Sequence, residues 1–296
     1  MIILGIGDSH EAHACIVKDG VLVAAISEER LSRLKADTGY PQRSIDAVLS
    51  IAGIDAKDID LVAFAGESGY LFQALYKCNA TLAVQDWVKQ CHKYWKPVLL
   101  EGRELSPFDD LELFLDKVPD IQNDPYYSFL DLARNSDPSN WNKIGQSVRM
   151  SAVNSHLGID AAKVEFFRHE DCHKFYGYHS AQTEKRDALV LTIEGGGDDS
   201  SATGSTIRNG ELNEHWRSND VMLGRLYRYV TLLLGMLPSQ HEYKVMGLAP
   251  YGTEYHGRRS LNFFRKVNRV VGGEIHNIGT LPDLYFSVKD ALEGER

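Results

Sequence analysis

The chain has 296 residues, of which 43% are hydrophobic and 25% charged, an ordinary globular composition with enough residues to bury a sizeable core. It carries 32 Lys and Arg against 41 Asp and Glu, and a net charge of −9 without a basic block predicts neither a nucleic-acid partner nor a membrane surface. Its four cysteines form no C-x-x-C pair, no signal peptide is evident, and the longest apolar stretch, 230–237, cannot span a membrane, so we expect a cytoplasmic protein.

The N-terminal segment predicts a three-stranded meander. Apolar runs rich in β-branched residues cover Ile2–Ile6, Ala12–Val17 and Val21–Ile26. The first turn is the polar Gly7–Ser9, and the second contains Asp19-Gly20, a dipeptide typical of two-residue hairpins.

The central part of the chain alternates between helical and strand patterns. Pro41–Ala52 predicts an amphipathic helix and Leu61–Ala65 a short buried strand. From about 70 to 158 the pattern is helical, irregular and broken by prolines, so we interpret it as a helical insertion. Val164–Phe167 predicts one more strand, and a helix should follow it over about Glu170–Gln182.

The pattern of the first segment then returns. Strands are predicted at the apolar run Ala188–Ile193, at Ser201–Ile207 and at Glu211–Trp216. An acidic glycine turn, Glu194–Asp199, follows the first of them, and Asn209-Gly210 connects the other two as a hairpin. The same order of strands and turns therefore occurs twice, which suggests two similar lobes.

Two histidines one helical turn apart form the first candidate site. His169 and His173, at i and i+4, can bind one metal through their ring nitrogens. The same residues satisfy H-E-x-x-H, in which Glu170 would be the general base of a zinc metallopeptidase and His179 a third ligand. Tyr176 stands where that motif needs a turn-forming glycine, which argues against the peptidase. The remaining alternative is a polar helix with surface histidines.

The two acidic turns, Gly7–His10 and Glu194–Ser200, form the second candidate site. Glycines let backbone N–H groups approach a phosphate, and a carboxylate at a strand end can hold a metal or a hydroxyl, although such turns are also common without a function. A third segment, Glu242–Gly252, has no amphipathic period and is predicted from composition alone to be a loop.

Four blocks of the chain together resemble one family, the NodU/CmcH-type O-carbamoyltransferases. Gly5–Ala12 is similar to the family's G-x-x-x-D-S-A-A turn, and Ile26–Lys35 to its E-E-R-[FL]-[ST]-R-x-K block. His169 and His173 match its H-x-x-x-H helix. The string E-Y-K-V-M-G-L-A-P-Y-G at Glu242–Gly252 is nearly identical to the family's most distinctive segment.

The resemblance implies an α/β fold of duplicated ribonuclease-H-like lobes of the actin/hexokinase type, each with a mixed five-stranded sheet, as in the tRNA threonylcarbamoyl-transfer proteins. The first lobe would cover 1–186 with its helical insertion at about 70–158, and the second would begin in 187–296. Two further strands with their helices would complete the second lobe. We therefore expect this chain to be one and a half lobes of a longer enzyme with a C-terminal YrdC-like domain.

The implied activity is carbamoyl transfer. The YrdC-like domain would make carbamoyl adenylate from ATP and carbamoyl phosphate. The lobes would then pass the carbamoyl group to a hydroxyl of a small molecule or glycoside, in nodulation-factor or secondary-metabolite biosynthesis. A divalent metal, iron or similar, would be held by His169, His173 and a later Asp, with Asp8 and Lys244 as catalytic residues. The residues implied at the nucleotide are Ser9, Arg30, Lys35, Glu194, Gly195, Gly196, Gly197, Asp198, Glu242 and Gly247.

The chain departs from the family pattern at three places. The family usually follows its first histidine with a second one and small residues, as in H-H-x-x-H-A-A-S-A, whereas Glu170–Cys172 and Lys174–Tyr176 stand here. Glu194 stands where an Asp is usual, and Gln240-His241 replaces Ser-Gly. A non-catalytic nucleotide- or metal-binding module of the same fold is therefore the alternative to the enzyme. No motif in the insertion identifies the acceptor.

Overall fold

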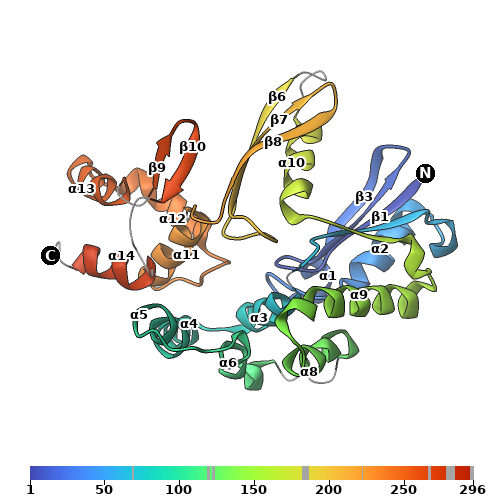
Figure 1. The fold of residues 1–296 in the computed structure, drawn as a ribbon, viewed down its shortest axis with the longest axis horizontal. Coiled ribbons are helices and arrows are strands. Elements are labelled where there is room, and N and C mark those ends of the chain that lie inside the picture. Colours follow the sequence, from blue (N-terminus) through green and yellow to red (C-terminus); the bar gives the residue numbers. More distant parts are fainter. Residues whose placement is uncertain are drawn as a thin grey trace. The chain divides into compact units, whose positions relative to one another are not determined.

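The computed structural model describes residues 1–68, 70–118, 121, 124–181, 187–221, 223–265, 268–277 and 284–293. The chain forms two compact units, Met1–Leu82 with Ser106–His169 and Ala83–Leu105 with Glu170–Arg296 (Figure 1). The lobe boundary predicted at residue 186 falls in 182–186, outside the described residues. The units divide earlier, between His169 and Glu170.

The first unit contains a mixed five-stranded sheet. Its strands are β1 (Ile2–Gly7), β2 (His13–Lys18), β3 (Val21–Ser27), β4 (Leu61–Ala65) and β5 (Val164–Phe167), in the order β3-β2-β1-β4-β5. The first three pair antiparallel, whereas β4 lies parallel to both β1 and β5. The predicted N-terminal meander and both later strands are thus confirmed.

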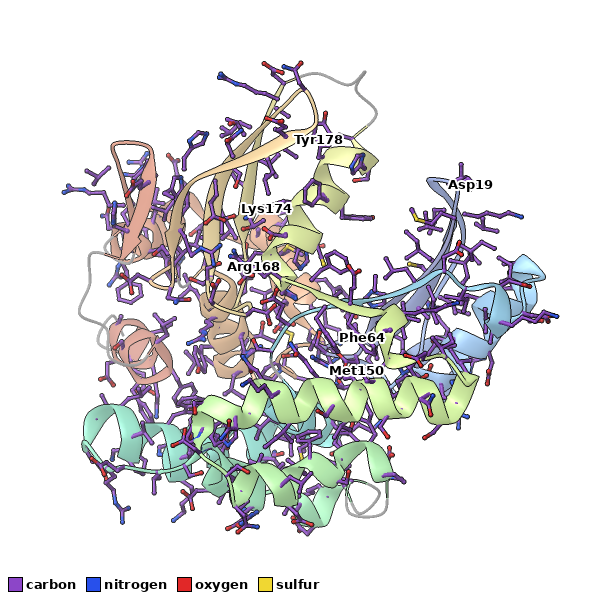
Figure 2. All side chains as sticks on the ribbon, turned by 45° about the vertical axis from the view of Figure 1, so that its right-hand side comes forward. Asp19, Phe64, Met150, Arg168, Lys174 and Tyr178 are labelled. Atoms are coloured by element: carbon purple, nitrogen blue, oxygen red, sulfur yellow. The ribbon has the colours of Figure 1, made fainter. Side chains whose placement is uncertain are left out.

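The core of this unit lies between the sheet and two helices. Leu4 and Ile6 of β1 alternate toward one face and are buried there with Ile45 of α2 (Gln42–Ala52) and Val153 of α9 (Trp141–Leu157). Phe64 on β4 and Met150 on α9 also belong to this cluster (Figure 2). Helix α2 follows Pro41 as predicted and ends at Gly53, whose φ of 63° is left-handed.

The predicted insertion is helical, and it contributes to both units. Within the insertion, besides α9, the first unit contains α3 (Tyr70–Thr81), α6 (Pro107–Glu112), η3 (Leu115–Lys117), η4 (Pro125–Ser128), α8 (Phe129–Arg134) and η5 (Pro138–Asn140). Outside the insertion, besides α2, it contains α1 (Glu29–Ser32), η1 (Ala56–Asp58) and η6 (Ala161–Lys163). The part that joins the second unit forms α4 (Val84–Gln90), η2 (Cys91–Trp95) and α5 (Lys96–Leu100). It packs there because the Arg228 guanidinium lies over the Trp87 ring and the His92 ring meets Phe286.

The second unit repeats the meander. Strands β6 (Ala188–Ile193), β7 (Ala202–Arg208) and β8 (Glu211–Ser218) form an antiparallel sheet in the order β6-β7-β8. Its second hairpin has a register shift between Gly204 and Ser205, as the first unit's has between Ile16 and Val17. The remaining elements are α10 (His169–Ser180), α11 (Leu223–Leu233), α12 (Glu242–Leu248), η7 (Ala249–Tyr251), α13 (Glu254–Phe264), β9 (Asn268–Val271), β10 (Glu274–Asn277) and α14 (Leu284–Glu293).

The prediction of a loop at Glu242–Gly252 was wrong. The segment forms helix α12 followed by the short helix η7. The Glu242 side chain accepts a 2.6 Å hydrogen bond from the N–H of Ser239 and thereby fixes the turn that precedes the helix. Such a local side-chain bond leaves no trace in the apolar periodicity.

The structure is therefore a mixed α/β protein. Within the described ranges, none of the helices combines the length and the apolar character that crossing a membrane requires.

Candidate functional site

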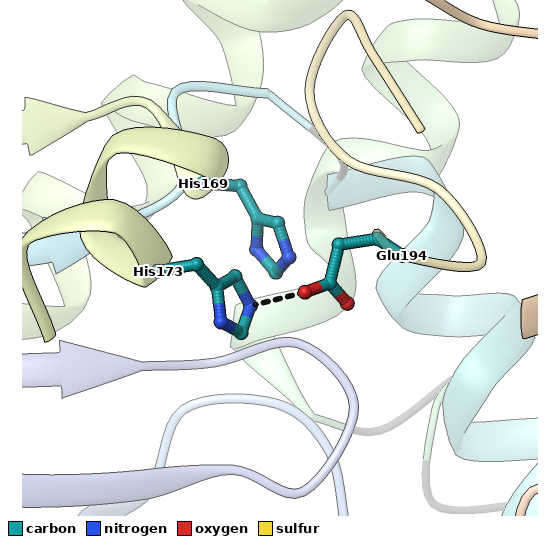
Figure 3. A group of neighbouring side chains, drawn as sticks. All are labelled: His169, His173 and Glu194. Carbon is teal, nitrogen blue, oxygen red and sulfur yellow. Dashed lines mark ion pairs between the residues drawn. The ribbon is translucent and has the colours of Figure 1, made fainter. Parts of the chain in front are cut away.

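Three side chains of two neighbouring segments come together as a candidate metal centre. His169 is the first residue of α10, His173 lies one turn later, and Glu194 directly follows β6. One ligand atom of each lies within 4.8 Å of the others, and His173 Nε2 is 3.5 Å from Glu194 Oε1. Figure 3 shows both imidazoles facing the Glu194 carboxylate.

These three residues fit a divalent transition metal. Two imidazoles and one carboxylate form a donor set used for iron and zinc, and they leave coordination positions open. Ligands bound at about 2.1 Å lie about 3.4 Å apart around a tetrahedral ion, which is close to the observed separation of His173 and Glu194. The His173 side chain is 44% exposed and the Glu194 side chain 28% exposed, so a substrate can reach the site.

Glu170 does not share the position of the histidines. Its carboxylate is fully buried, and Oε1 accepts hydrogen bonds from the N–H groups of Asp199, at 3.1 Å, and Ser200, at 3.0 Å. A zinc peptidase of the H-E-x-x-H type would need this carboxylate beside the metal as a base. The geometry thus disagrees with the peptidase interpretation.

His179 does not complete a zinc site either. Its ring stacks on Phe175, with centroids 6.3 Å apart, and meets the edge of Tyr178. A third donor near His169 and His173 is Glu194, which the resemblance had implied as a nucleotide-binding residue and whose turn the sequence had suggested for a phosphate, a metal or a hydroxyl.

A buried lysine attaches α10 to the second sheet. Lys174 is fully buried, and its ammonium lies 2.6 Å from Glu214 of β8 and 2.9 Å from Asp171 (Figure 2). Because Glu170 and Lys174 are the buried residues of α10, polar contacts hold this helix in the second unit. These contacts explain why α10, from Glu170 onward, belongs to the second unit.

The glycine turn after β6 carries the predicted residues Glu194 to Asp198 and is held on both sides. The Gly195 carbonyl accepts a 2.8 Å hydrogen bond from Arg225 Nε of α11, and a Cβ at Gly224 would lie 2.7 Å from Gly195 N. A Cβ at Gly197 would lie 2.3 Å from Glu170 Oε1, so that position requires glycine. Gly195 and Asp198 are half-buried, whereas Gly196 and Gly197 are exposed.

Asp8, the predicted base, is buried and paired in the first unit. Arg149 Nε lies 2.6 Å from Asp8 Oδ2, and Arg149 Nη2 lies 3.0 Å from Oδ1. The Tyr126 hydroxyl donates to the same Oδ2, and Asp8 is only 1% exposed. Ser9, which follows it, is half-buried. Both Asp8 oxygens are therefore occupied within the protein.

The groups around Asp8 have shifted ionisation. Burial, and next the Asp8 carboxylate, hold the pKa of the Tyr126 phenol well above its usual range. Burial opposes the charge of Arg149, but Asp8 and Tyr126 more than offset it and raise the pKa of the guanidinium. The cluster therefore holds a charged Arg149 and a neutral Tyr126 at neutral pH.

The E-E-R block contains one residue that the sequence did not suggest. Glu28 is buried and accepts hydrogen bonds from the N–H of Ser44, at 2.8 Å, and from its hydroxyl, at 2.7 Å, so it caps helix α2. Lys35 is exposed, and its Nζ lies 2.9 Å from Glu29 Oε2. Arg30 is exposed and lines an open cavity of about 420 Å³ together with His13 and Ser27.

The predicted residues of the block Glu242–Gly252 lie on α12 in the second unit. Lys244 is exposed, with its ammonium 5.8 Å from the centroid of the Tyr243 ring. Glu242 binds the N–H of Ser239. Gly247 is exposed, and a Cβ added there would point into open space.

Known proteins place this arrangement in a family. The family model described as Carbamoyltransferase N-terminus matches residues 2–262. The chain belongs to this family. Nodulation protein NolNO of Sinorhizobium fredii is 30% identical over 246 residues, which cover 82% of this chain and 28% of that protein.

Two uncharacterized proteins are also similar to this carbamoyltransferase-family chain. One, from Synechocystis, is 28% identical over 82% of this chain and 33% of its own length. The other, from Methanocaldococcus jannaschii, is 24% identical over 86% of this chain and 34% of its own length. The chain thus spans about a third of the length of these relatives.

The carbamoyltransferase family match covers all four blocks that the sequence singled out. The structure brings His169, His173 and the Glu194 turn together within it. Arg149 and Tyr126 were missed because they lie 141 and 118 residues from Asp8, in a segment without a motif. The burial of Arg149 becomes visible only once the fold is known, so the sequence carried no signal for it.

Proposed function

We propose that the chain is the N-terminal part of an O-carbamoyltransferase and contributes the site at which the carbamoyl group is transferred. The supporting observation is that the two histidines of the family's H-x-x-x-H helix face Glu194 of the acidic turn. We also propose that the two meanders belong to duplicated ribonuclease-H-like lobes. A mixed sheet in the first unit and a repeated meander with a matching register shift support this.

The proposed reaction uses carbamoyl adenylate, made from ATP and carbamoyl phosphate by a YrdC-like domain. The oxygen of an acceptor hydroxyl attacks the carbamoyl carbon and forms the new C–O bond. The bond from that carbon to the phosphate oxygen breaks, and AMP leaves with its electron pair. The hydroxyl proton passes to a base, so the products are the carbamate ester and AMP.

The residues of α10, of the turn after β6 and of α12 would hold the adenylate. A divalent metal such as iron, when bound by His169, His173 and Glu194, would supply Lewis-acid charge. The backbone N–H groups of Gly195 to Gly197 suit a phosphate, because glycines permit close approach. Lys244, exposed on α12, would add positive charge for the leaving phosphate. Asp198, Glu242 and Gly247 complete this proposed set, in which Glu242 acts by fixing α12.

The residues of the first unit would serve the acceptor and the nucleotide. Asp8 would orient or deprotonate the acceptor hydroxyl, and this requires that Arg149 or Tyr126 release one of its oxygens. Ser9, Arg30 and Lys35 would bind phosphate groups. The acceptor is proposed to be a small molecule or glycoside, and the reaction to occur in the cytoplasm.

Metal binding by the purified chain tests the centre of this proposal. We expect one equivalent of Fe²⁺ or Co²⁺ per chain, lost in His169→Ala and in His173→Ala. His179→Ala is the matched control, because His179 lies on the same helix but packs against Phe175 and Tyr178. Wild-type affinity in both His169→Ala and His173→Ala would exclude the proposed site.

Activity requires a second assay. A full-length version of the protein, with the rest of the expected second lobe and the YrdC-like domain, would be incubated with ATP, carbamoyl phosphate and a panel of hydroxyl compounds, and carbamate esters detected by mass spectrometry. Metal-dependent ester formation supports the transferase. Binding of metal and ATP without any ester would instead identify the non-catalytic binding module.

A further inference from the structure

Glu170 stands between the two histidines in the sequence, yet its carboxylate points into the protein. We propose that Glu170 is a positioning residue that locks the Glu194–Ser200 turn onto α10 and thereby fixes Glu194 opposite His173. This inference rests on the proposed metal site. It gives the acidic residue of the H-E-x-x-H string a role without proton transfer.

The contacts of one oxygen carry the argument. Glu170 Oε1 accepts from both Asp199 N and Ser200 N, at the end of the turn whose first residue is Glu194. Hydrogen bonds from backbone amides to a carboxylate are about twice as strong as neutral ones, and burial shields them from water. Since Glu170 is fully buried, this contact fixes the turn relative to α10.

The turn itself is built to receive this carboxylate. Oε1 occupies the space of a side chain at Gly197, where a Cβ would lie 2.3 Å away. Glu194 N donates a 2.7 Å hydrogen bond to Ser201 O, so the first residue of the turn is tied to the residue that follows the turn. A displacement at Asp199 and Ser200 therefore moves Glu194 as well.

Three other side chains that contact the turn do so at exposed positions. Arg225 reaches the Gly195 carbonyl, Arg217 reaches the Asp199 carboxylate, and Asn219 Nδ2 donates a 2.8 Å hydrogen bond to the Asp199 carbonyl. Arg217 also binds Glu214, which pairs with the buried Lys174 of α10. This path connects the turn to α10 through flexible and partly solvated side chains, whereas Glu170 connects them directly.

Glu170→Ala and Glu170→Gln separate positioning from a merely structural contribution. Glu170→Ala removes the acceptor of both amides, whereas the carbonyl oxygen of Gln can still accept from them. The second oxygen, Oε2, is buried without a hydrogen-bond partner in the described part of the chain, so no donor opposes the Gln amide. Glu165→Ala, at an exposed glutamate of β5, is the control.

Co²⁺ titration of the full chain, followed by visible absorption, measures the effect on the site. We expect Glu170→Ala to weaken Co²⁺ binding by about 10–100-fold and to change the d–d spectrum, the range typical of supporting residues around metal ligands. Glu170→Gln should retain the wild-type spectrum and most of the affinity, and Glu165→Ala both. Unchanged affinity and spectrum in Glu170→Ala would overturn the inference.

Hydrogen exchange of the peptide 194–201 tests the attachment without a metal. In Glu170→Ala the amides of Asp199 and Ser200 should exchange faster by tenfold or more, with little change in Glu165→Ala. Equal protection in Glu170→Ala and the wild type would refute the lock. If the wild-type chain binds no Co²⁺ and Glu170→Ala still shows faster exchange at Asp199 and Ser200, the metal site and the positioning role are refuted. The contact of Glu170 with the turn would nevertheless be demonstrated.

Discussion

Arg149 and Asp8 form a bidentate ion pair in the interior of the first unit. The guanidinium lies 2.6 Å and 3.0 Å from the two carboxylate oxygens, and the side chains are 2% and 1% exposed. Arg149 belongs to α9 and Asp8 to the turn after β1, so the pair joins the insertion to the predicted catalytic turn.

Removing one partner should expose the cost of an unpaired buried charge. Arg149→Met leaves the Asp8 carboxylate uncompensated, and we expect the free energy of unfolding to fall by about 3–5 kcal/mol. The double substitution Asp8→Asn with Arg149→Met should recover part of this loss, because no lone charge remains. Urea unfolding of the wild type, Asp8→Asn, Arg149→Met and the double variant gives the coupling energy.

Arg134→Met is the matched control for that measurement. Arg134 also pairs with a carboxylate, that of Glu112, but the two side chains are 42% and 49% exposed. A solvated pair of this kind contributes about 0–1 kcal/mol. Equal effects of Arg134→Met and Arg149→Met would contradict the assigned burial of the Asp8 pair.

The raised pKa of Tyr126 predicts a dependence of stability on alkaline pH. Its unfolded-state pKa is about 10, and burial and Asp8 raise the folded-state pKa above this value. The stability that the neutral phenol contributes is therefore complete below pH 10 and is lost as the pH rises toward the folded-state pKa, by up to about 1.4 kcal/mol per pH unit. Tyr126→Phe lacks this term.

Urea unfolding between pH 8 and pH 12 checks this prediction. The wild type should be more stable than Tyr126→Phe by a constant amount below pH 10, and the difference should shrink above it. Tyr176→Phe, at a tyrosine 73% exposed, should follow the wild-type pH profile. Parallel profiles of the wild type and Tyr126→Phe across the whole range would argue against the buried phenol.

Local patterns in the sequence were sufficient for the strands of both meanders. Alternating apolar residues and the dipeptides Asp19-Gly20 and Asn209-Gly210 fix them without help from distant contacts. Helix α12 could not be predicted this way, since the contact of Glu242 with Ser239 has no periodicity. The packing of α10 in the second unit has no sequence pattern for a related reason. Lys174 is typical of a solvated helix face, and its burial depends on Glu214 of β8.

The candidate site, like the fold, could be predicted only where its residues form a local pattern. The spacing of His169 and His173 is a local property, so the pair was found from sequence. Glu194 was found as part of a turn, but its place beside His173 depends on how β6 and α10 pack. Arg149 had no sequence signal at all, because charged residues are rarely fully buried and only the fold brings this one to Asp8.

The E-E-R block should separate into structural and ligand-binding residues. Glu28→Ala removes a buried cap of α2 and should lower the free energy of unfolding by about 2 kcal/mol or more. Lys35→Ala breaks an exposed pair and should change it by less than about 1 kcal/mol. If Lys35 binds nucleotide as proposed, calorimetry should show weaker ATP binding in this variant. Unchanged ATP affinity in Lys35→Ala would show that Lys35 does not bind nucleotide and forms only the exposed ion pair with Glu29.

Gly197 and Gly196 are adjacent, but only one of them has room for a methyl group. A Cβ at Gly197 would lie 2.3 Å from Glu170 Oε1 and 2.8 Å from Ser200 O, whereas a Cβ at Gly196 would have Arg225 Nη2 at 3.5 Å as its nearest neighbour. Gly197→Ala should therefore displace either the Glu170 carboxylate or the turn, and weaken Co²⁺ binding by about tenfold, as expected for a lost supporting contact.

Gly196→Ala adds the same methyl group without that collision, so it should bind Co²⁺ as the wild type does. Neither glycine has a positive φ among the described residues, so alanine strains the backbone at neither position. Combining Gly197→Ala with Glu170→Ala should weaken binding by less than the sum of the two single losses, because both substitutions break the same contact, while the approach of the added methyl group to Ser200 O remains in the double variant. Additive losses in the double variant would show that Gly197 acts on the site by a route other than Glu170.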